Sequence, residues 1–233
     1  MKKVLFFLIG LGFLCSCATH APTGDLQYFD LRGNVSSLDN EYFFPNSTAS
    51  FDKDGYLIID DENATVDTLS RLDNYMLKEY RGPFRVIKFD IYEKIGAYEN
   101  GRPIVEYKDL IYDSSNRLIA IDGIFNSFYL YYDDEGWLCS IVSFEEGGMV
   151  TDFTYDKKGT RIKEHCFVPV ITNDGYMDRH KVAEENWTLE YERHRFDKHG
   201  NWVARWAVKR DLDGTILGES EEFRDGEIKY YDE

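Results

Sequence analysis

The sequence FDKHGNW (residues 196–202) has four related copies elsewhere in the chain. They are FDKDGYL (51–57), YDSSNRL (112–118), YDDEGWL (132–138) and YDKKGTR (155–161). Each copy has an aromatic residue first, Asp second and Gly fifth, except that Asn116 takes the place of Gly in one of them. From residue 112 onward the copies fit a period of about 20 residues, which is typical of a repeat architecture.

The spacing of Asp and Gly within each copy is that of a β-turn. A type I turn prefers Asp at its first position and Gly at its fourth, where the backbone is left-handed. The Asp side chain accepts hydrogen bonds from the backbone of the turn, and Asn also tolerates the left-handed region. We therefore expect three-residue hairpin loops with a glycine bulge, built on Asp52 and Gly55, Asp113 and Asn116, Asp133 and Gly136, Asp156 and Gly159, and Asp197 and Gly200.

In such a hairpin the first and seventh positions of a copy face each other across the two strands, where aromatic and aliphatic side chains stabilise the pair. The expected pairs are Phe51 with Leu57, Tyr112 with Leu118, Tyr132 with Leu138, and Phe196 with Trp202. In the remaining copy Arg161 fills the seventh position. A change of register that brings Ile162 into its place is the expected adjustment.

Strand-like segments separated by turn residues dominate the rest of the chain. The predicted strands cover residues 34–44, 49–51, 56–59, 85–98, 103–112, 117–121, 127–132, 137–144, 149–155, 161–168, 187–196, 202–210, 216–223 and 227–231. Residues 169–184 are expected to form a polar loop. Apolar residues at helical spacing predict a short helix over 67–80 with Asp67 as its cap, and a strand is the alternative. The predicted fold is mainly β, an antiparallel β-hairpin repeat meander forming a curled sheet or roll.

The tyrosine–aspartate–glycine pattern resembles the YD repeats of the RHS type. The copy at 196–202, followed by Arg205, is similar to the D-x-x-G-N-W-x-x-R pattern of uncharacterised lipoproteins of Bacteroidota, and LRGNV (31–35) resembles their first strand. An array of MORN-like hairpins is the neighbouring family. The resemblance implies antiparallel hairpins and an envelope location, and it implies no particular activity. RHS shells enclose a cargo, for which this chain has too few repeats.

The first 16 residues are predicted to be a signal peptide, with Lys2 and Lys3 before an apolar stretch that is short for a membrane span. The sequence LCSC (14–17) resembles a bacterial lipobox with Cys17 as the acylated residue. Ala18 after the cysteine indicates the outer membrane by the sorting rule of that class, and the lack of acidic residues before Asp25 favours the periplasmic leaflet. We expect residues 17–29 to be a tether and 30–233 to be a single β-repeat domain.

The composition limits the classes of partner. The chain has a net charge of −16 and 16% aromatic residues. The acidic charge disfavours nucleic acid and anionic lipid surfaces, which attract basic proteins. A lipid anchor is therefore needed to hold the protein at the membrane.

The acidic turns and the histidines could bind a metal ion, but each also has a structural explanation. The turns at Asp52 and Asp211 each place two carboxylates two residues apart, but they lack the third ligand and the distant Glu of an EF-hand. His194 and His199 flank the last repeat turn without a third zinc ligand. We expect turn formation, with no metal and no cofactor.

Cys139 and Cys166 are expected on strands separated by one intervening strand. That separation, about 9.5 Å, exceeds the Cα distance of a disulfide, so free thiols are favoured and a disulfide is the alternative. His165 precedes Cys166, but adjacent strand residues point to opposite faces, which disfavours a thiol–imidazole pair. Asp67-Thr68-Leu69 resembles the O-glycosylation motif of Bacteroidota, with Thr68 as the acceptor.

Aromatic residues near the C-terminus are the candidate binding surface: Trp187, Tyr191, Trp202 and Trp206. Their alternative role is to form the core. The expected function is that of a lipid-anchored cell-envelope module that binds or scaffolds without catalysis, with an unknown envelope protein or glycan as the partner. The alternatives are an immunity or inhibitor protein for a cationic partner, and a carboxylate-dependent hydrolase.

Overall fold

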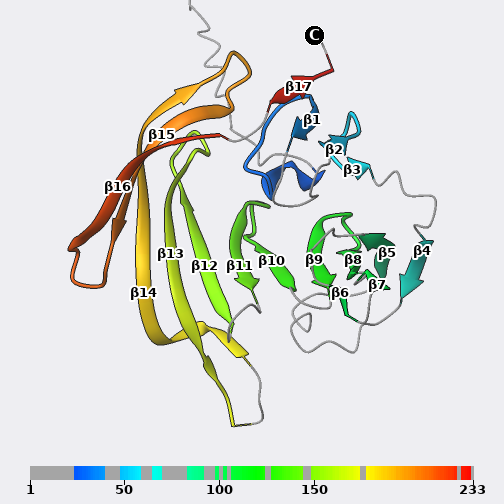
Figure 1. Ribbon diagram of the computed structural model, residues 1–233, viewed down its shortest axis with the longest axis horizontal. Coiled ribbons are helices and arrows are strands. Elements are labelled where there is room, and N and C mark those ends of the chain that lie inside the picture. The colour runs from blue at the N-terminus through cyan, green and yellow to red at the C-terminus, as the bar shows by residue number, and fades with distance from the viewer. Residues whose placement is uncertain are drawn as a thin grey trace, which may run out of the picture.

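The computed structural model describes residues 24–39, 48–58, 65–69, 83–91, 98–99, 102–103, 106–123, 127–143, 148–173, 177–224 and 227–231. Most of them form one antiparallel sheet of 11 strands that curls from one edge strand to the other (Figure 1). In spatial order the strands are β16 (Ile216–Phe223), β15 (Trp202–Arg210), β14 (Met177–Phe196), β13 (Arg161–Ile171), β12 (Met149–Tyr155), β11 (Leu138–Ser143), β10 (Phe128–Tyr132), β9 (Leu118–Gly123), β8 (Glu106–Tyr112), β5 (Phe84–Ile91) and β4 (Thr65–Leu69). The predicted mainly β, curled hairpin meander is confirmed.

The repeated motif forms the predicted turn in every copy. In the second copy the Asn116 N–H donates to the Asp113 carbonyl at 2.9 Å, and Asn116 has a φ of 59°. The glycines at the same position have φ values between 75° and 88°. The segment Asp211 to Gly214 forms a sixth turn of this kind, since the Gly214 N–H donates to the Asp211 carbonyl.

The turns also fix the predicted register. The four expected pairs are present: Phe51 with Leu57, Tyr112 with Leu118, Tyr132 with Leu138, and Phe196 with Trp202. The expected shift at the other copy is wrong, because Tyr155 pairs with Arg161 itself. The same glycine bulge sets the register whatever the seventh residue is, and the Arg161 guanidinium packs 4.0 Å from the centre of the Phe153 ring.

A smaller antiparallel sheet lies against one end of the curled sheet (Figure 1). It contains β17 (Ile228–Tyr230), β1 (Val35–Asp39), β2 (Thr48–Phe51) and β3 (Leu57–Ile58), and the 3-10 helix η1 (Gly24–Gln27) precedes it. The strand β17 pairs with β1, so the chain leaves the hairpin order after β16. The strands β6 (Tyr98–Glu99) and β7 (Arg102–Pro103) pair with each other, and the predicted Asn-Gly turn at 100–101 lies outside the described residues.

Both faces of the central strands are buried. Leu110 and Tyr112 belong to a core that includes Phe51 and the residues after η1, such as Leu31. Ile111, between them in sequence, belongs to a second core on the opposite face. Leu26 and Phe29 are also buried in the first core. The folded part of the chain therefore extends into residues 17–29, where the sequence predicts a tether.

Two local predictions differ from the structure. Asp67 does not cap a helix but pairs with Val86 of β5, so the alternative of a strand is confirmed up to Leu69; residues 70–80 lie outside the described residues. The predicted loop at 169–184 is instead an extension of the hairpin between β13 and β14. The pairing passes from Pro169–Val182 to Val170–Asp178, so residues 179–181 form a bulge. The Arg179 guanidinium lies 3.9 Å from the centre of the Tyr131 ring, which anchors this bulge.

Candidate functional site

The segment from Gly24 to Arg32, called here the N-terminal clasp, is bonded to successive repeat turns. At its start the Asp25 N–H donates to the Gly55 carbonyl of the first turn at 2.8 Å. The Asp25 carboxylate accepts the Leu57 N–H at 2.8 Å and the Tyr112 hydroxyl at 3.1 Å. One buried side chain thus connects the first two copies of the repeat.

The next contact of the clasp is made by Gln27, which closes the third turn from both sides. Its amide nitrogen donates to the Gly136 carbonyl at 2.9 Å, and its amide oxygen accepts the Leu138 N–H at 2.8 Å. These contacts satisfy backbone groups that a hairpin end leaves open, and buried backbone groups need such partners.

Arg32 connects the fourth and fifth turns. Its guanidinium donates to the carbonyls of Lys158, at 2.8 Å, and Gly159. Its own backbone is bound on both sides by Asn201, whose amide oxygen accepts the Arg32 N–H at 2.7 Å and whose amide nitrogen donates to the Arg32 carbonyl at 3.0 Å. The clasp therefore contacts all five predicted repeat copies.

The aspartates of the motif serve their own turns. In four of the five copies one carboxylate oxygen accepts the backbone N–H groups two and four residues later, as for Asp52 with Asp54 and Tyr56, both at 2.9 Å. For Asp133 the described bond is to the Trp137 N–H at 2.7 Å. Among the described residues no group of three or more His, Cys, Asp or Glu side chains is placed to hold a metal ion.

Asp25 is the most deeply buried carboxylate of the clasp. Its residue is 1% exposed, and its second carboxylate oxygen has no hydrogen-bond partner. Burial raises the pKa of Asp25 to about 6, although the bonds from Leu57 and Tyr112 oppose this. Burial also raises the pKa of the Tyr112 phenol, and the nearby Asp25 carboxylate adds to the effect. A pKa near neutrality is common in catalytic acids, but this carboxylate is enclosed by protein.

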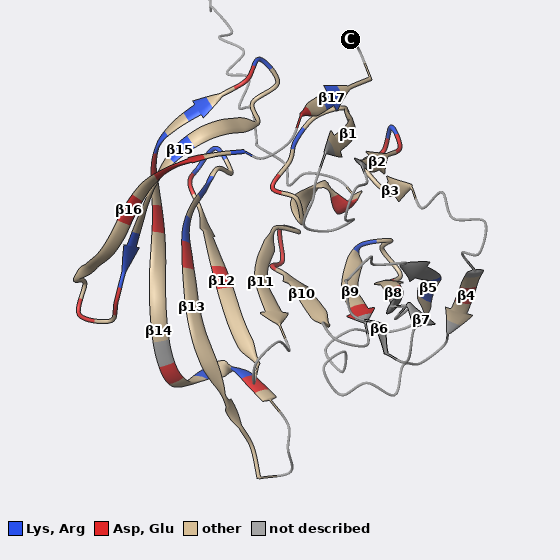
Figure 2. Ribbon diagram, in the orientation of Figure 1, with Lys and Arg blue, Asp and Glu red and all other residues tan. Residues whose placement is uncertain are grey.

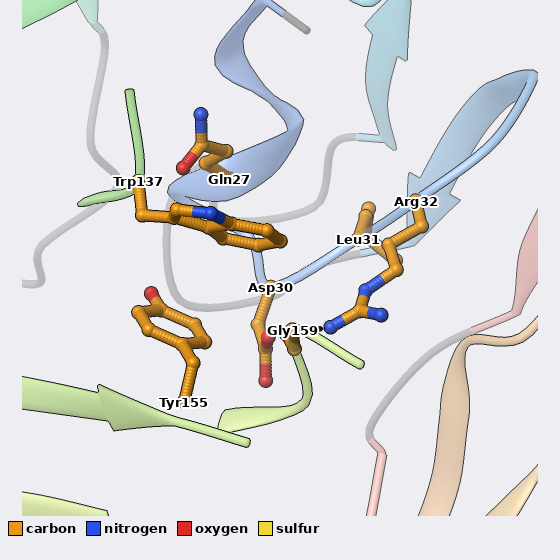
Figure 3. Close-up of a pocket in the computed structure, with 7 residues that line it drawn as sticks. All are labelled: Gln27, Asp30, Leu31, Arg32, Trp137, Tyr155 and Gly159. Atoms are coloured by element: carbon orange, nitrogen blue, oxygen red, sulfur yellow. Dashed lines mark hydrogen bonds between the residues drawn. The ribbon is translucent and has the colours of Figure 1, made fainter. Parts of the chain in front are cut away.

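A small hollow opens beside the clasp (Figure 3). Its volume is about 10 Å³, room for about one water molecule. The ring of Trp137 lies over it, and Tyr155, Arg32 and the carboxylate of Asp30 border it. A single carboxylate beside a water-sized space does not provide the pair of acids that hydrolysis of a glycosidic bond uses.

Asp30 is the centre of a second group of contacts between the clasp and the last strands. It accepts the indole N–H of Trp202 at 2.7 Å, and Arg205 lies 3.7 Å from the same oxygen. Arg224 donates to the backbone carbonyls of Phe29 and Asp30 at 2.9 and 2.8 Å. Burial lowers the pKa of Arg224 to about 10, so this guanidinium remains charged at neutral pH.

The four predicted binding aromatics each have a cationic side chain over the ring. Arg205 lies between two of them, 3.3 Å from the centre of Tyr191 and 4.1 Å from that of Trp202. Lys209 lies 4.7 Å from the centre of Trp187, and Arg193 lies 5.5 Å from that of Trp206. One face of each ring is therefore used by the chain itself, and Tyr191 is buried.

His194 and His199 each stack on a different aromatic ring, and Cys139 and Cys166 lie on strands that are not adjacent. His194 stacks on Phe196, with ring centres 5.7 Å apart, whereas His199 stacks on Tyr230 at 3.6 Å. Burial lowers the pKa of His194. Cys139 on β11 and Cys166 on β13 are free thiols with β12 between them, as the strand order predicts.

Of the two predicted modification sites, the structure describes Thr68 but not Cys17. Thr68 lies exposed on the edge strand β4, where a glycan would meet solvent. Cys17 and the predicted signal peptide lie outside the described residues. Both modifications remain predictions.

The opposite edge strand, β16, exposes more of its side chains than any other long strand in the described part of the chain. Seven of its eight residues are exposed. Acidic residues mark the strand and its turn in Figure 2. This segment lies outside the repeat motif and the candidate aromatics; its signal in the sequence is a run of acidic residues beside apolar ones.

Comparison with known proteins adds no family. The chain matches no protein-family model, and no curated protein matches it significantly. In the described residues we find no helix with the length and apolar character needed to cross a membrane.

Proposed function

We propose that this protein is a lipid-anchored β-repeat protein of the bacterial cell envelope, acting as a non-catalytic binding or scaffold module. The observation that carries the proposal is the position of the clasp. The described fold begins at Gly24, seven residues after Cys17, and its first segment is bonded to every predicted repeat copy. An acyl chain at Cys17 would thus attach the membrane to the segment that holds the hairpins together.

Binding is a better fit than hydrolysis for the carboxylates described. The motif aspartates accept bonds within their own turns, and Asp25 is enclosed in the core. A carboxylate-dependent hydrolase needs two acids facing a substrate-sized space. The support for a binding role comes instead from an open curled sheet with an exposed, acidic edge strand.

A second candidate is an immunity or inhibitor protein that covers a cationic partner. The net charge of −16 and the glutamates of β16 favour this role. It differs from the first candidate only in the consequence of binding, because both place a partner on the protein surface.

The lipid anchor can be tested by expressing the protein in a bacterium that processes lipoproteins. Globomycin, which blocks signal peptide removal from lipoproteins, should leave an unprocessed precursor, and palmitate label should enter the protein. Replacing Cys17 by Ser should abolish the label and release the protein from the membrane fraction, whereas Cys15→Ser should leave both unchanged. Normal processing under globomycin would contradict the proposed anchor. Protease added to intact cells should spare the protein if it lies in the periplasmic leaflet.

A further inference from the structure

The strand β16 forms one edge of the curled sheet. It pairs with β15, and within the described residues no strand pairs with its other edge. Large apolar side chains stand in solvent along it: Ile216 is 48% exposed, Leu217 55% and Phe223 60%. Exposed edge strands are templates for the addition of another strand, and proteins protect those that are not used.

The hydrogen bonds of β15 and β16 show which backbone groups face outward. The Arg224 N–H donates to the Val203 carbonyl, so these two residues form a hydrogen-bonded pair. In an antiparallel ladder such pairs alternate with pairs that turn their N–H and C=O groups away. Following the register, Glu219, Glu221 and Phe223 direct their backbone groups to the free edge.

The same three residues also share one face of the strand, because side chains alternate along a β-strand. That face carries Phe223 and the two glutamates. Leu217 precedes them in a β-bulge, because Arg210 pairs with Ile216 and Lys209 with Gly218. Arg195 of β14 bonds to Glu221 at 2.8 Å and lies over the Phe223 ring at 5.6 Å, which holds both side chains in place. On the other face a Cβ added to Gly218 would meet no atom within 4 Å, so there is open space beside it.

We propose that the free edge of β16 binds an extended, basic segment of a partner protein as an added strand. The inference rests on the proposed binding function and names the surface and the chemistry of the partner. Backbone bonds to Glu219, Glu221 and Phe223 supply the attachment, and Lys or Arg side chains opposite the two glutamates supply the selectivity. An apolar residue of the segment covers Phe223.

A second copy of this chain is a poorer occupant of the same edge. Pairing β16 with its own copy would bring the glutamates of the two strands alongside one another. Like charges opposite each other destabilise a strand pair. The net charge of −16 on each copy adds to the repulsion at low ionic strength.

The test uses the full lipidated chain in detergent and two labelled peptides. The basic probe is a seven-residue strand with the sequence TKVKVKT, and its matched control, TEVEVET, replaces each lysine by glutamate. Fluorescence anisotropy should show that the basic peptide binds at least ten-fold more tightly than the acidic one. Hydrogen exchange followed by mass spectrometry should show slower exchange within β16 when the basic peptide is present.

Variants of Glu219 separate backbone pairing from charge. Glu219→Pro removes an outward N–H and should weaken basic-peptide binding at least ten-fold, because edge positions accept proline without loss of the internal ladder. Glu219→Thr keeps the N–H and should stay within about three-fold of wild type. Glu219→Lys keeps the backbone N–H but reverses the side-chain charge. It should weaken binding of the basic peptide relative to the acidic one.

Equal binding to wild type and Glu219→Pro, or protection confined to other strands, would overturn the proposal. A dimer in sedimentation experiments that Glu219→Pro dissociates would also overturn it in favour of a second copy. The proposed function is tested separately by cross-linking in whole cells. If envelope partners are cross-linked equally to wild type and Glu219→Pro, the binding function stands and the β16 assignment fails.

Discussion

Gly159 packs directly beneath the indole ring of Trp137: a Cβ added to this glycine would lie 2.3 Å from the Cη2 atom of the ring. Its φ is 75°, so a side chain here meets both backbone strain and a clash. Gly200 has the same place in the next copy and a φ of 88°, but no atom lies within 4 Å of an added Cβ. We predict that Gly159→Ala is the more destabilising substitution.

The expected costs can be separated by chemical denaturation of both variants. A non-glycine residue in the left-handed region costs about 1–2 kcal/mol, which Gly200→Ala should show. Overpacking adds about 1–3 kcal/mol, so the unfolding free energy of Gly159→Ala should fall by that further amount. Equal losses in the two variants would mean that Trp137 moves away at little cost.

Gln27→Glu tests the clasp. The amide of Gln27 donates to the Gly136 carbonyl and accepts the Leu138 N–H, so a carboxylate can replace only the acceptor. Leaving a buried carbonyl without its donor, and placing a charge beside it, should cost on the order of 1–3 kcal/mol at neutral pH. Protonation restores a donor, and the stability gap to wild type should therefore narrow in acid. A gap that does not depend on pH would contradict this account.

The sequence was sufficient for features that depend on neighbours along the chain. The turn at Asp113 to Asn116 follows from four consecutive residues, and its bulge fixes the opposition of Tyr112 and Leu118. Each hairpin then places its strand beside the next. This is why the order from β8 to β16 could be predicted without any distant contact.

Features that depend on distant residues could not be predicted in this way. The bond of Gln27 to Gly136 joins residues 109 positions apart, and the motif gives no sign of it. The strand β17 pairs with β1 near the start of the chain instead of continuing the meander. Residues 180–184 of the expected loop are exposed in β14, and polarity alone does not distinguish an exposed strand from a loop.

The two internal cysteines should behave as unequal free thiols. Cys166 is fully buried, whereas Cys139 is partly exposed, and burial raises the pKa of both. Because the thiolate is the reactive form, both should react slowly with Ellman's reagent in the folded protein, with Cys139 the faster. Cys139→Ser should remove the faster phase. After unfolding without reductant both thiols should react at once; if neither did, a disulfide would be present.

Asp25 should make the stability of the fold depend on pH. Burial raises its pKa from 3.8 in the unfolded chain to about 6 in the folded protein, so the folded state binds the proton more tightly. The unfolding free energy should therefore decrease as the pH rises from about 4 to about 6. The shift corresponds to about 3 kcal/mol, at 1.36 kcal/mol for each pKa unit.

Other carboxylates titrate in the same range, and Asp25→Asn isolates the contribution of this one. The asparagine can still accept the Leu57 N–H but does not titrate. The difference in unfolding free energy between wild type and Asp25→Asn should shift in favour of wild type by about 3 kcal/mol when the pH falls from 7 to 4. Guanidinium denaturation at constant ionic strength measures this difference. A difference that is constant across this range would mean that Asp25 is charged in the folded state at pH 4, and that water reaches its unpaired oxygen.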